Sequence, residues 1–262
     1  MGLLEKDRMS ELDDFARRTQ ELEIENRRLK HEIEDLHNQT GGLVAALADL
    51  KRSYELTLEA LGGALDLKDA ETQNHTQRVT AYTIAIARKM GLKNEISVMA
   101  RSAFLHDIGL MAIPENILRK PGKLNDEEVA KMKEHSYLGY NILRKIPFLA
   151  QAAEIVYAHQ ERYDGTGYPR GLKGDEIPLG ARVVSIADTL DAMTSDRPYR
   201  PAQSLEAARK EIERWSGRQF DPQIARVFLE MPPNIWEDLR KDLDSQITRF
   251  PQHVAGRQNL PY

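Results

Sequence analysis

The 262-residue chain contains no cysteine, and this absence narrows the chemistry that it can perform. Disulfides, thiolate metal ligands and iron–sulfur clusters are excluded, so any metal must be held by nitrogen and oxygen. Such ligands suit Mn, Fe or Zn in a hydrolytic site. The chain also lacks an apolar signal-peptide core and any uncharged apolar run approaching about 18 residues. We therefore expect a cytoplasmic protein with no membrane span.

Neither sign of charge dominates the chain. It has 37 Lys and Arg against 41 Asp and Glu, which gives a net charge of −4. A broad basic surface for duplex nucleic acid is not expected, so DNA is not a predicted partner. Charged residues make up 30% and hydrophobic residues 41% of the chain, as in a folded protein with a large solvated surface.

Residues 1–60 contain no proline and carry a heptad pattern. Apolar residues recur at every seventh position, and Asn26 occupies one position of the second apolar row. This pattern predicts a coiled coil and favours a homodimer that relays a signal from an upstream partner. The alternative is one long amphipathic helix that folds onto its own domain. The first row comprises Phe15, Leu22, Leu29, Leu36, Leu43 and Leu50, and the second includes Leu12, Asn26, Ile33, Leu47 and Tyr54.

Beyond residue 60 the pattern changes to helices of ordinary length, interrupted by a loop rich in Gly and Pro at 164–178. Few runs alternate as strands do, so we expect an all-α fold: a helical bundle preceded by a long N-terminal coiled-coil helix. We predict a coiled-coil segment at 1–60, a helical domain at 61–235, and a helix and tail at 236–262. The expected helices cover 71–90, 94–105, 127–144, 148–160, 181–194, 204–215 and 222–231, with Asn125 or Asp126 as a cap of the third.

Four histidines of the helical domain have neighbours that suggest metal chemistry. His106 is followed by Asp107, whose carboxylate can bridge two cations. Glu71 and His75 are spaced i, i+4 and share a helical face. Asp188 and Asp191 lie in an otherwise apolar helix, where charges are costly unless paired or metal-bound. Each pair alone has an ordinary explanation as a cap or ion pair, but the series is far more specific: Glu71, His75, His106, Asp107, His135, His159 and Asp188.

Between Leu61 and Met231 the sequence resembles the HD-GYP branch of the HD phosphohydrolase superfamily. The motifs are His75-Thr76-Gln77-Arg78, Leu105-His106-Asp107-Ile108-Gly109, Glu134-His135, His159 through the loop Asp164-Gly165-Thr166-Gly167-Tyr168-Pro169, and Asp188 through Asp196-Arg197-Pro198-Tyr199-Arg200.

The resemblance implies a helical bundle around two or three divalent metal ions, Fe or Mn, that hydrolyses cyclic di-GMP to linear pGpG and GMP. His106 and Asp107 would be catalytic. The implied metal ligands are Glu71, His75, His106, Asp107, His135, His159 and Asp188. The residues implied to meet substrate are Gly165, Gly167, Tyr168, Arg197 and Arg200.

Two positions depart from the family pattern. Leu110 stands where the family usually has Lys, and Gln160 stands where it usually has a second histidine. The first change removes a cation, and the second offers a neutral amide oxygen in place of imidazole. Two alternatives to a cyclic di-GMP phosphodiesterase therefore stay open. One is a degenerate domain that binds a cyclic dinucleotide or a protein as a signalling scaffold, and the other is a hydrolase of another phosphoester.

Overall fold

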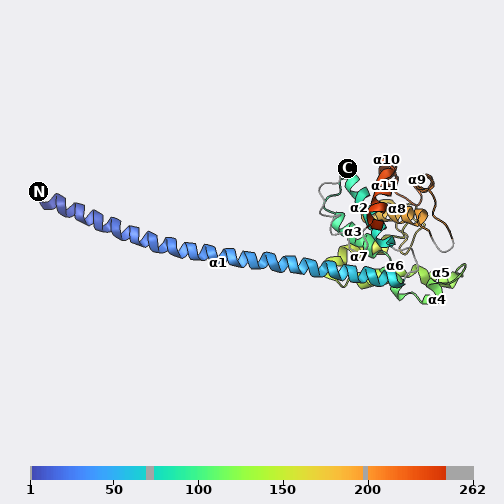
Figure 1. The fold of residues 1–262 in the computed structure, drawn as a ribbon, viewed down its shortest axis with the longest axis horizontal. Coiled ribbons are helices and arrows are strands. Elements are labelled where there is room, and N and C mark those ends of the chain that lie inside the picture. The colour runs from blue at the N-terminus through green and yellow to red at the C-terminus, as the bar shows by residue number, and fades with distance from the viewer. Residues whose placement is uncertain (1, 69–73, 197–199, 246–262) are drawn as a thin grey trace. The chain divides into compact units, whose positions relative to one another are not determined.

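The computed structural model describes residues 2–68, 74–196 and 200–245 (Figure 1). Across these ranges every secondary-structure element is a helix, and the β-structure is limited to one isolated bridge between Ser216 and Phe220. The predicted all-α fold, with a long N-terminal helix before a helical bundle, is confirmed. No helix in the described ranges is long and apolar enough to cross a membrane, and the cytoplasmic location stays a prediction.

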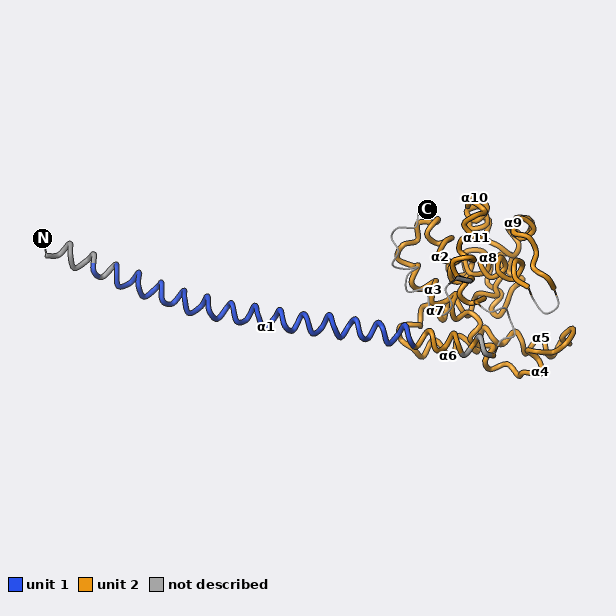
Figure 2. Tube along the Cα trace, viewed as in Figure 1, with its two compact units in different colours: residues 1–56 blue, residues 57–262 orange. Residues whose placement is uncertain are grey.

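Helix α1 (Gly2–Lys68) is continuous through the heptad region and extends past residue 60. The chain divides into two compact units, residues 1–56 and 57–262 (Figure 2). In the first unit the heptad leucines face solvent: Leu22 is 70% exposed and Leu36 is 56% exposed. Gly41 and Gly42 lie within the helix and a Cβ at either position would meet nothing within 4 Å. The heptad therefore forms one uninterrupted helix whose apolar seam is exposed in the first unit.

The C-terminal end of α1 belongs to the second unit and packs into its core. Leu58 and Leu65 are buried beside Phe104. Gly62 lies against the same ring, because a Cβ at this position would come within 2.4 Å of two Phe104 carbons. The absence of a side chain at residue 62 thus lets α1 approach the bundle closely.

The second unit contains ten further α-helices among the described residues. They surround two hydrophobic clusters, one centred on α2, α8 and α10 and the other on the end of α1, α3 and α7. Their bounds are α2 (His75–Lys89), α3 (Ile96–Leu105), α4 (Glu115–Leu118), α5 (Asp126–Lys133), α6 (His135–Leu143), α7 (Ala150–Ala158), α8 (Leu179–Thr194), α9 (Leu205–Arg214), α10 (Pro222–Glu230) and α11 (Asn234–Ser245). Three 3₁₀ turns complete the list, η1 (Ile108–Ala112), η2 (Pro147–Leu149) and η3 (Gly174–Glu176).

Polar side chains cap the N-terminal ends of several of these helices. Of the two cap residues considered for α5, Asp126 and Asn125, the structure has Asn125, which forms the reciprocal capping box with Glu128. Ser204 accepts a hydrogen bond from the Ala207 backbone at the start of α9. Asp221 accepts one from the Gln223 backbone before α10. These caps satisfy backbone N–H groups that have no partner within the helix.

Two predicted helices have different bounds in the structure. Of the helix predicted at 71–90, the structure describes α2 from His75 to Lys89, preceded by Asn74 with a φ of 70°, outside the helical region; residues 71–73 lie outside the described part of the chain. The helix predicted at 127–144 is two helices, α5 and α6, separated at Glu134. At that break Nδ1 of His135 lies 2.8 Å from the carbonyl oxygen of Met132. In a continuous helix this oxygen would accept a hydrogen bond from a backbone N–H of the next turn. Hydrophobic periodicity does not reveal this competition.

Helix packing brings the ends of distant segments together. Helix α2 packs against α3 and α8, and α6 packs against α7 and η1. Helix α3 in turn contacts α7, which joins the two groups. The residues that begin or end these helices therefore converge on one region of the bundle.

Candidate metal centre

Six of the predicted ligands form two adjacent groups of three. His75 begins α2, His106 and Asp107 follow the end of α3, and His135 begins α6. His159 follows α7, and Asp188 lies within α8. In each group one nitrogen or oxygen atom from every residue lies within 4.8 Å of the others. The first group is His75, His106 and Asp188, and the second is Asp107, His135 and His159.

The first group joins three helices that are far apart in the sequence. The Nε2 atoms of His75 and His106 lie 3.8 Å and 4.0 Å from the same oxygen, Oδ1 of Asp188. His106 is only 1% exposed, whereas the Asp188 side chain is 28% exposed. The group therefore has a buried imidazole wall and a carboxylate at its solvent side.

The second group has the same composition of nitrogen and oxygen atoms. The Nε2 atoms of His135 and His159 lie 3.2 Å apart, and each lies 3.6 Å from Oδ1 of Asp107. The other oxygen of Asp107, Oδ2, lies 3.2 Å from Nε2 of His106. Asp107 thus presents one oxygen to each group, as a carboxylate that bridges two cations must.

The Nδ1 atoms of all four histidines face away from the centre and have contacts of their own. In three of them Nδ1 lies 2.6–2.8 Å from a backbone carbonyl three residues earlier: Ala103 for His106, Met132 for His135 and Val156 for His159. His75 differs, because its Nδ1 lies 2.7 Å from Oδ2 of Asp191. A hydrogen bond donated by Nδ1 leaves Nε2 as the unprotonated, ligating nitrogen.

These side chains fit a divalent metal pair. The Nε2 atom of His106 is buried and has no hydrogen-bond partner among the described residues, although it faces Asp107 and Asp188. A buried polar atom without a partner is costly, and a bound cation would remove that cost. The donor set of imidazole and carboxylate suits Mn, Fe or Zn. The two groups are therefore suited to hold two ions that share Asp107.

The electrostatics of the cluster favour a cation as well. Burial alone would lower the pKa of His106, but Asp107 and Asp188 raise it to about 10. Burial alone would raise the pKa of Asp107, but His106, His159 and His135 hold it well below its usual range. The pKa of His135 is lowered, by burial first and then by the positive charge of His159. The carboxylate of Asp107 stays ionised, and together with Asp188 it favours a positive charge beside His106, which a proton or a bound cation can supply.

Asp191 and Arg78 stand directly behind the first group, and neither was among the predicted site residues. Asp191 is fully buried, and Arg78 donates to both of its oxygens. Burial opposes the charge of Asp191, but hydrogen bonds from His75 and Arg78 lower its pKa to about 2. The pair of acids at 188 and 191 in an otherwise apolar helix was a visible signal in the sequence. The contact of Asp191 with Arg78, 113 residues earlier in the chain, was not visible there.

Tyr168 reaches the same centre from the glycine-rich loop. Its ring lies edge-on to His135 with centroids 6.3 Å apart. Burial, followed by the negative charges of Asp107 and Asp188, raises its pKa to about 12. The hydroxyl therefore stays protonated at neutral pH and is available as a donor near the carboxylates.

Internal hydrogen bonds hold the loop that carries Tyr168. Buried Glu161 accepts backbone N–H groups of Arg170 and Leu172 at 2.7 and 3.1 Å. Gly167 packs against the backbone before it, because a Cβ there would lie 2.3 Å from the Arg162 nitrogen. Gly165 has a φ of +83°, which favours glycine. These contacts give both glycines a role in shaping the loop.

Gly109 allows η1 to approach α6. A Cβ at this position would lie 1.9 Å from the His135 carbonyl oxygen and 2.6 Å from the Gly139 nitrogen. The space beside Gly109, where another residue would have its side chain, is therefore filled by protein backbone. Gly109 sets how close Asp107 and His135 can come.

Several predicted positions lie elsewhere or outside the described residues. Leu110 is 7% exposed and packs in the second hydrophobic cluster, and Gln160 lies in the turn after α7. Arg200 is exposed and donates to the Ala192 carbonyl at 2.6 Å. Glu71 and Arg197 lie outside the described residues.

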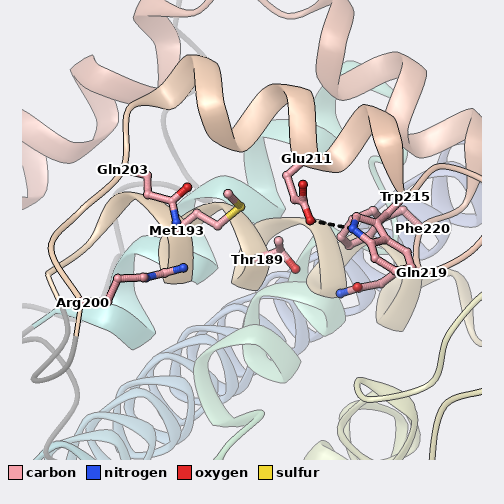
Figure 3. Close-up of a pocket in the computed structure, with 8 residues that line it drawn as sticks. All are labelled: Thr189, Met193, Arg200, Gln203, Glu211, Trp215, Gln219 and Phe220. Carbon is pink, nitrogen blue, oxygen red and sulfur yellow. Dashed lines mark hydrogen bonds between the residues drawn. The ribbon is translucent and has the colours of Figure 1, made fainter.

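A pocket of about 400 Å³ lies beside α8 (Figure 3). Thr189, the residue after Asp188, lines it together with Arg200 and Met193. At its far end Trp215 donates to a Glu211 carboxylate oxygen at 2.6 Å. Successive helical residues point about 100° apart. The pocket therefore opens on the face of α8 next to the one that carries Asp188.

The fold and the site define a helical metal-binding domain with two adjacent His and Asp sites. The sequence pattern of the HD domain family matches residues 59–224, more than half of the chain. The chain belongs to that family. The resemblance noted in the sequence is thereby confirmed.

Named relatives narrow the comparison. A "Cyclic di-GMP phosphodiesterase" of Thermotoga maritima is 40% identical over 205 residues, covering 77% of this chain and 55% of the relative. The "Cyclic di-GMP phosphodiesterase response regulator RpfG" of Xanthomonas campestris is 38% identical, covering 71% and 50%. A "3'3'-cGAMP-specific phosphodiesterase 2" of Vibrio cholerae is 37% identical, covering 70% and 36%. The chain thus spans about half the length or less of these relatives.

A solved structure supports the fold. The chain superposes on a cyclic GMP-AMP specific phosphodiesterase of Vibrio cholerae with a TM-score of 0.59 and 21% identity. The match covers 77% of this chain and 54% of the other. At this identity the likeness shows the fold alone.

Proposed function

We propose that this protein is a metal-dependent phosphodiesterase that hydrolyses cyclic di-GMP to linear pGpG, GMP or both. The observation that carries the proposal is the pair of ligand groups that share Asp107, one carboxylate oxygen to each. Relatives at 40% and 38% identity bear the name of this activity. A phosphodiester is an anion that repels hydroxide, and a pair of cations offsets that repulsion.

Two divalent ions, Fe or Mn, would occupy the two groups. The first would be held by His75, His106 and Asp188, and the second by His135 and His159, with Asp107 between them. When bound, such ions neutralise a phosphate and lower the pKa of water to about 7. Glu71 is proposed as the ligand of a third ion. That assignment derives from the family pattern alone.

The chain's own groups would orient the substrate and the attacking water. Asp107, kept ionised by its histidine neighbours, can accept a hydrogen bond from that water and align it with the phosphorus atom. His106 lies beside Asp107 on the buried side, with its Nε2 atom 3.2 Å from Oδ2. Tyr168, kept protonated, can donate to a phosphate oxygen. Proximity and orientation of this kind account for a large part of catalysis in general.

Arg200 is proposed to meet a second part of the dinucleotide. Arg200 is exposed and lines the same pocket as Thr189, the residue after Asp188 (Figure 3). A guanidinium pairs with phosphate through charge-assisted, often bidentate, hydrogen bonds. Arg197, Gly165 and Gly167 are proposed on the family pattern as further substrate contacts.

The test is turnover of cyclic di-GMP by protein prepared anaerobically with Fe(II) or Mn(II). We expect hydrolysis that disappears in Asp107→Ala, and Asp175→Ala serves as a control because its side chain is 89% exposed. Parallel assays with 3′3′-cGAMP and cyclic di-AMP identify a hydrolase of another phosphoester. No turnover of any of the three substrates by metal-loaded protein would refute the proposed function.

One observation favours a second candidate function, a binding domain without hydrolysis. The side chain at position 110 is an apolar one packed in the core, and position 160 is an amide. A domain of this kind would bind cyclic di-GMP or a protein partner and relay a signal. Tight binding of cyclic di-GMP with no product formation would distinguish it from the enzyme.

We further propose that the N-terminal segment 1–60 is a coiled coil that dimerises the chain and can receive a signal from an upstream partner. The support is the exposed seam along α1, including Leu29 at 48% and Leu36 at 56%. Replacing both with Asp is expected to give monomers in sedimentation. Ile24→Asp lies off the seam at an exposed position and should leave a dimer. An unchanged mass of the double variant would contradict the dimer.

A further inference from the structure

Lys133 lies next to the candidate metal centre, at the end of α5 and against the ring of Tyr168. It is the last residue of α5, two positions before the ligand-group residue His135. Its ammonium nitrogen lies 5.1 Å from the centroid of the Tyr168 ring. The lysine thus lies against the tyrosine ring that makes a T-shaped contact with His135.

The charge of Lys133 is not neutralised by a neighbour. Within the part of the chain that the structure describes, it makes no ion pair. Its neighbour Lys131 pairs with Glu134 at 2.7 Å, and Lys120 pairs with Glu128. A cation that is exposed, stacked on an aromatic ring and left without a carboxylate can accept an anion from solvent.

Tyr168 connects this cation to the ligand groups. Its ring centroid lies 6.3 Å from that of His135 in the second ligand group. The ring therefore lies close both to Lys133 and to a residue of the second ligand group. An anion bound at the ligand groups and against Tyr168 would lie within the reach of a lysine side chain.

We propose that Lys133 is a substrate-positioning residue that pairs with a phosphate oxygen of the bound dinucleotide. The inference rests on the proposed function and deepens it. Lysine presents a compact point charge on a flexible stem, which suits a phosphate at the rim of a site. The competing explanation is a favourable charge at the C-terminal end of α5, which would affect helix stability alone.

Kinetics of Lys133→Gln separate the two explanations. We expect KM for cyclic di-GMP to rise roughly tenfold, as for loss of one charge-assisted contact, with kcat changed less than about twofold. Lys133→Arg should restore KM to near the wild-type value. Lys131→Gln is the matched control, because it removes a neighbouring lysine that is already paired. The rise in KM of Lys133→Gln should also shrink as salt is added.

The outcomes distinguish failure of this inference from failure of the proposed function. An unchanged KM in Lys133→Gln, or an equal rise in Lys131→Gln, would overturn the role of Lys133 while turnover by the wild type stands. A lower melting temperature with unchanged KM would assign Lys133 to helix stability. If the wild type hydrolyses nothing, calorimetric binding of cyclic di-GMP to wild type and Lys133→Gln tests the contact by itself. Equal affinities would then overturn it.

Discussion

The carboxylate behind His75 should control both the stability of the bundle and the affinity of one metal site. Asp191 is buried, contacts Nδ1 of His75 at 2.7 Å and receives both hydrogen bonds from Arg78. Its pKa falls from 3.8 to about 2. Since one pKa unit is about 1.4 kcal/mol, Asp191→Asn should lower the free energy of unfolding of metal-free protein by roughly 2–3 kcal/mol.

The same substitution should weaken metal binding selectively. Loss of an outer hydrogen-bond partner of a histidine ligand costs roughly 10–100-fold in affinity. Titration with Mn(II), with free ion measured by electron paramagnetic resonance, should show one weakened site and one unchanged site. Only His75, in the first group, depends on Asp191.

Asp221→Asn is the matched control for this experiment. Asp221 is also buried and accepts from an arginine, Arg182, at 2.7 Å, but it contacts none of the six ligand-group residues. Its loss should lower stability and leave both Mn(II) affinities intact. If Asp191→Asn behaved like Asp221→Asn, with stability lost and Mn(II) binding unchanged, the argument that Asp191 orients His75 would be refuted.

Three further predictions concern backbone packing and pH. Gly109→Ala places a methyl group 1.9 Å from the His135 carbonyl, so it should unfold the protein at lower urea and weaken Mn(II) binding at the second group. Gly41 lies in open space on α1, so Gly41→Ala should instead stabilise the helix by up to about 1 kcal/mol. Circular dichroism should show this as a higher helix content. Because the pKa of Asp191 is depressed, its contribution to stability is present above about pH 4 and is lost as pH falls toward 2. Urea unfolding of metal-free wild type and Asp191→Asn should therefore converge at low pH.

The sequence predicts which residues carry the chemistry better than it predicts how they group. His106 and Asp107 are adjacent in the chain, yet their side chains belong to different ligand groups. His75 joins His106 through a contact between α2 and α3, and Asp188 joins them from α8. Spacing along a helix describes neighbours within one turn or two. It contains no information on which helices lie side by side.

The same limit explains the differences in helix bounds. Periodicity continues through Glu134, and the break there depends on His135 taking the Met132 carbonyl while Gly109 meets the backbone of the new helix. Caps, by contrast, are local. The box formed by Asn125 and Glu128 was therefore predictable from four consecutive residues.

The position of each histidine relative to its helix explains why one metal site should be more sensitive than the other. A histidine that directly follows a helical turn can use a carbonyl of that turn to fix its ring, and this needs no distant partner. His75 is the first residue of α2, and its Nδ1 contacts Asp191 from α8. Movement of α8 against α2 would therefore alter the first group before the second. Three histidines use the local arrangement, each with its Nδ1 beside the carbonyl three residues earlier: His106, His135 and His159.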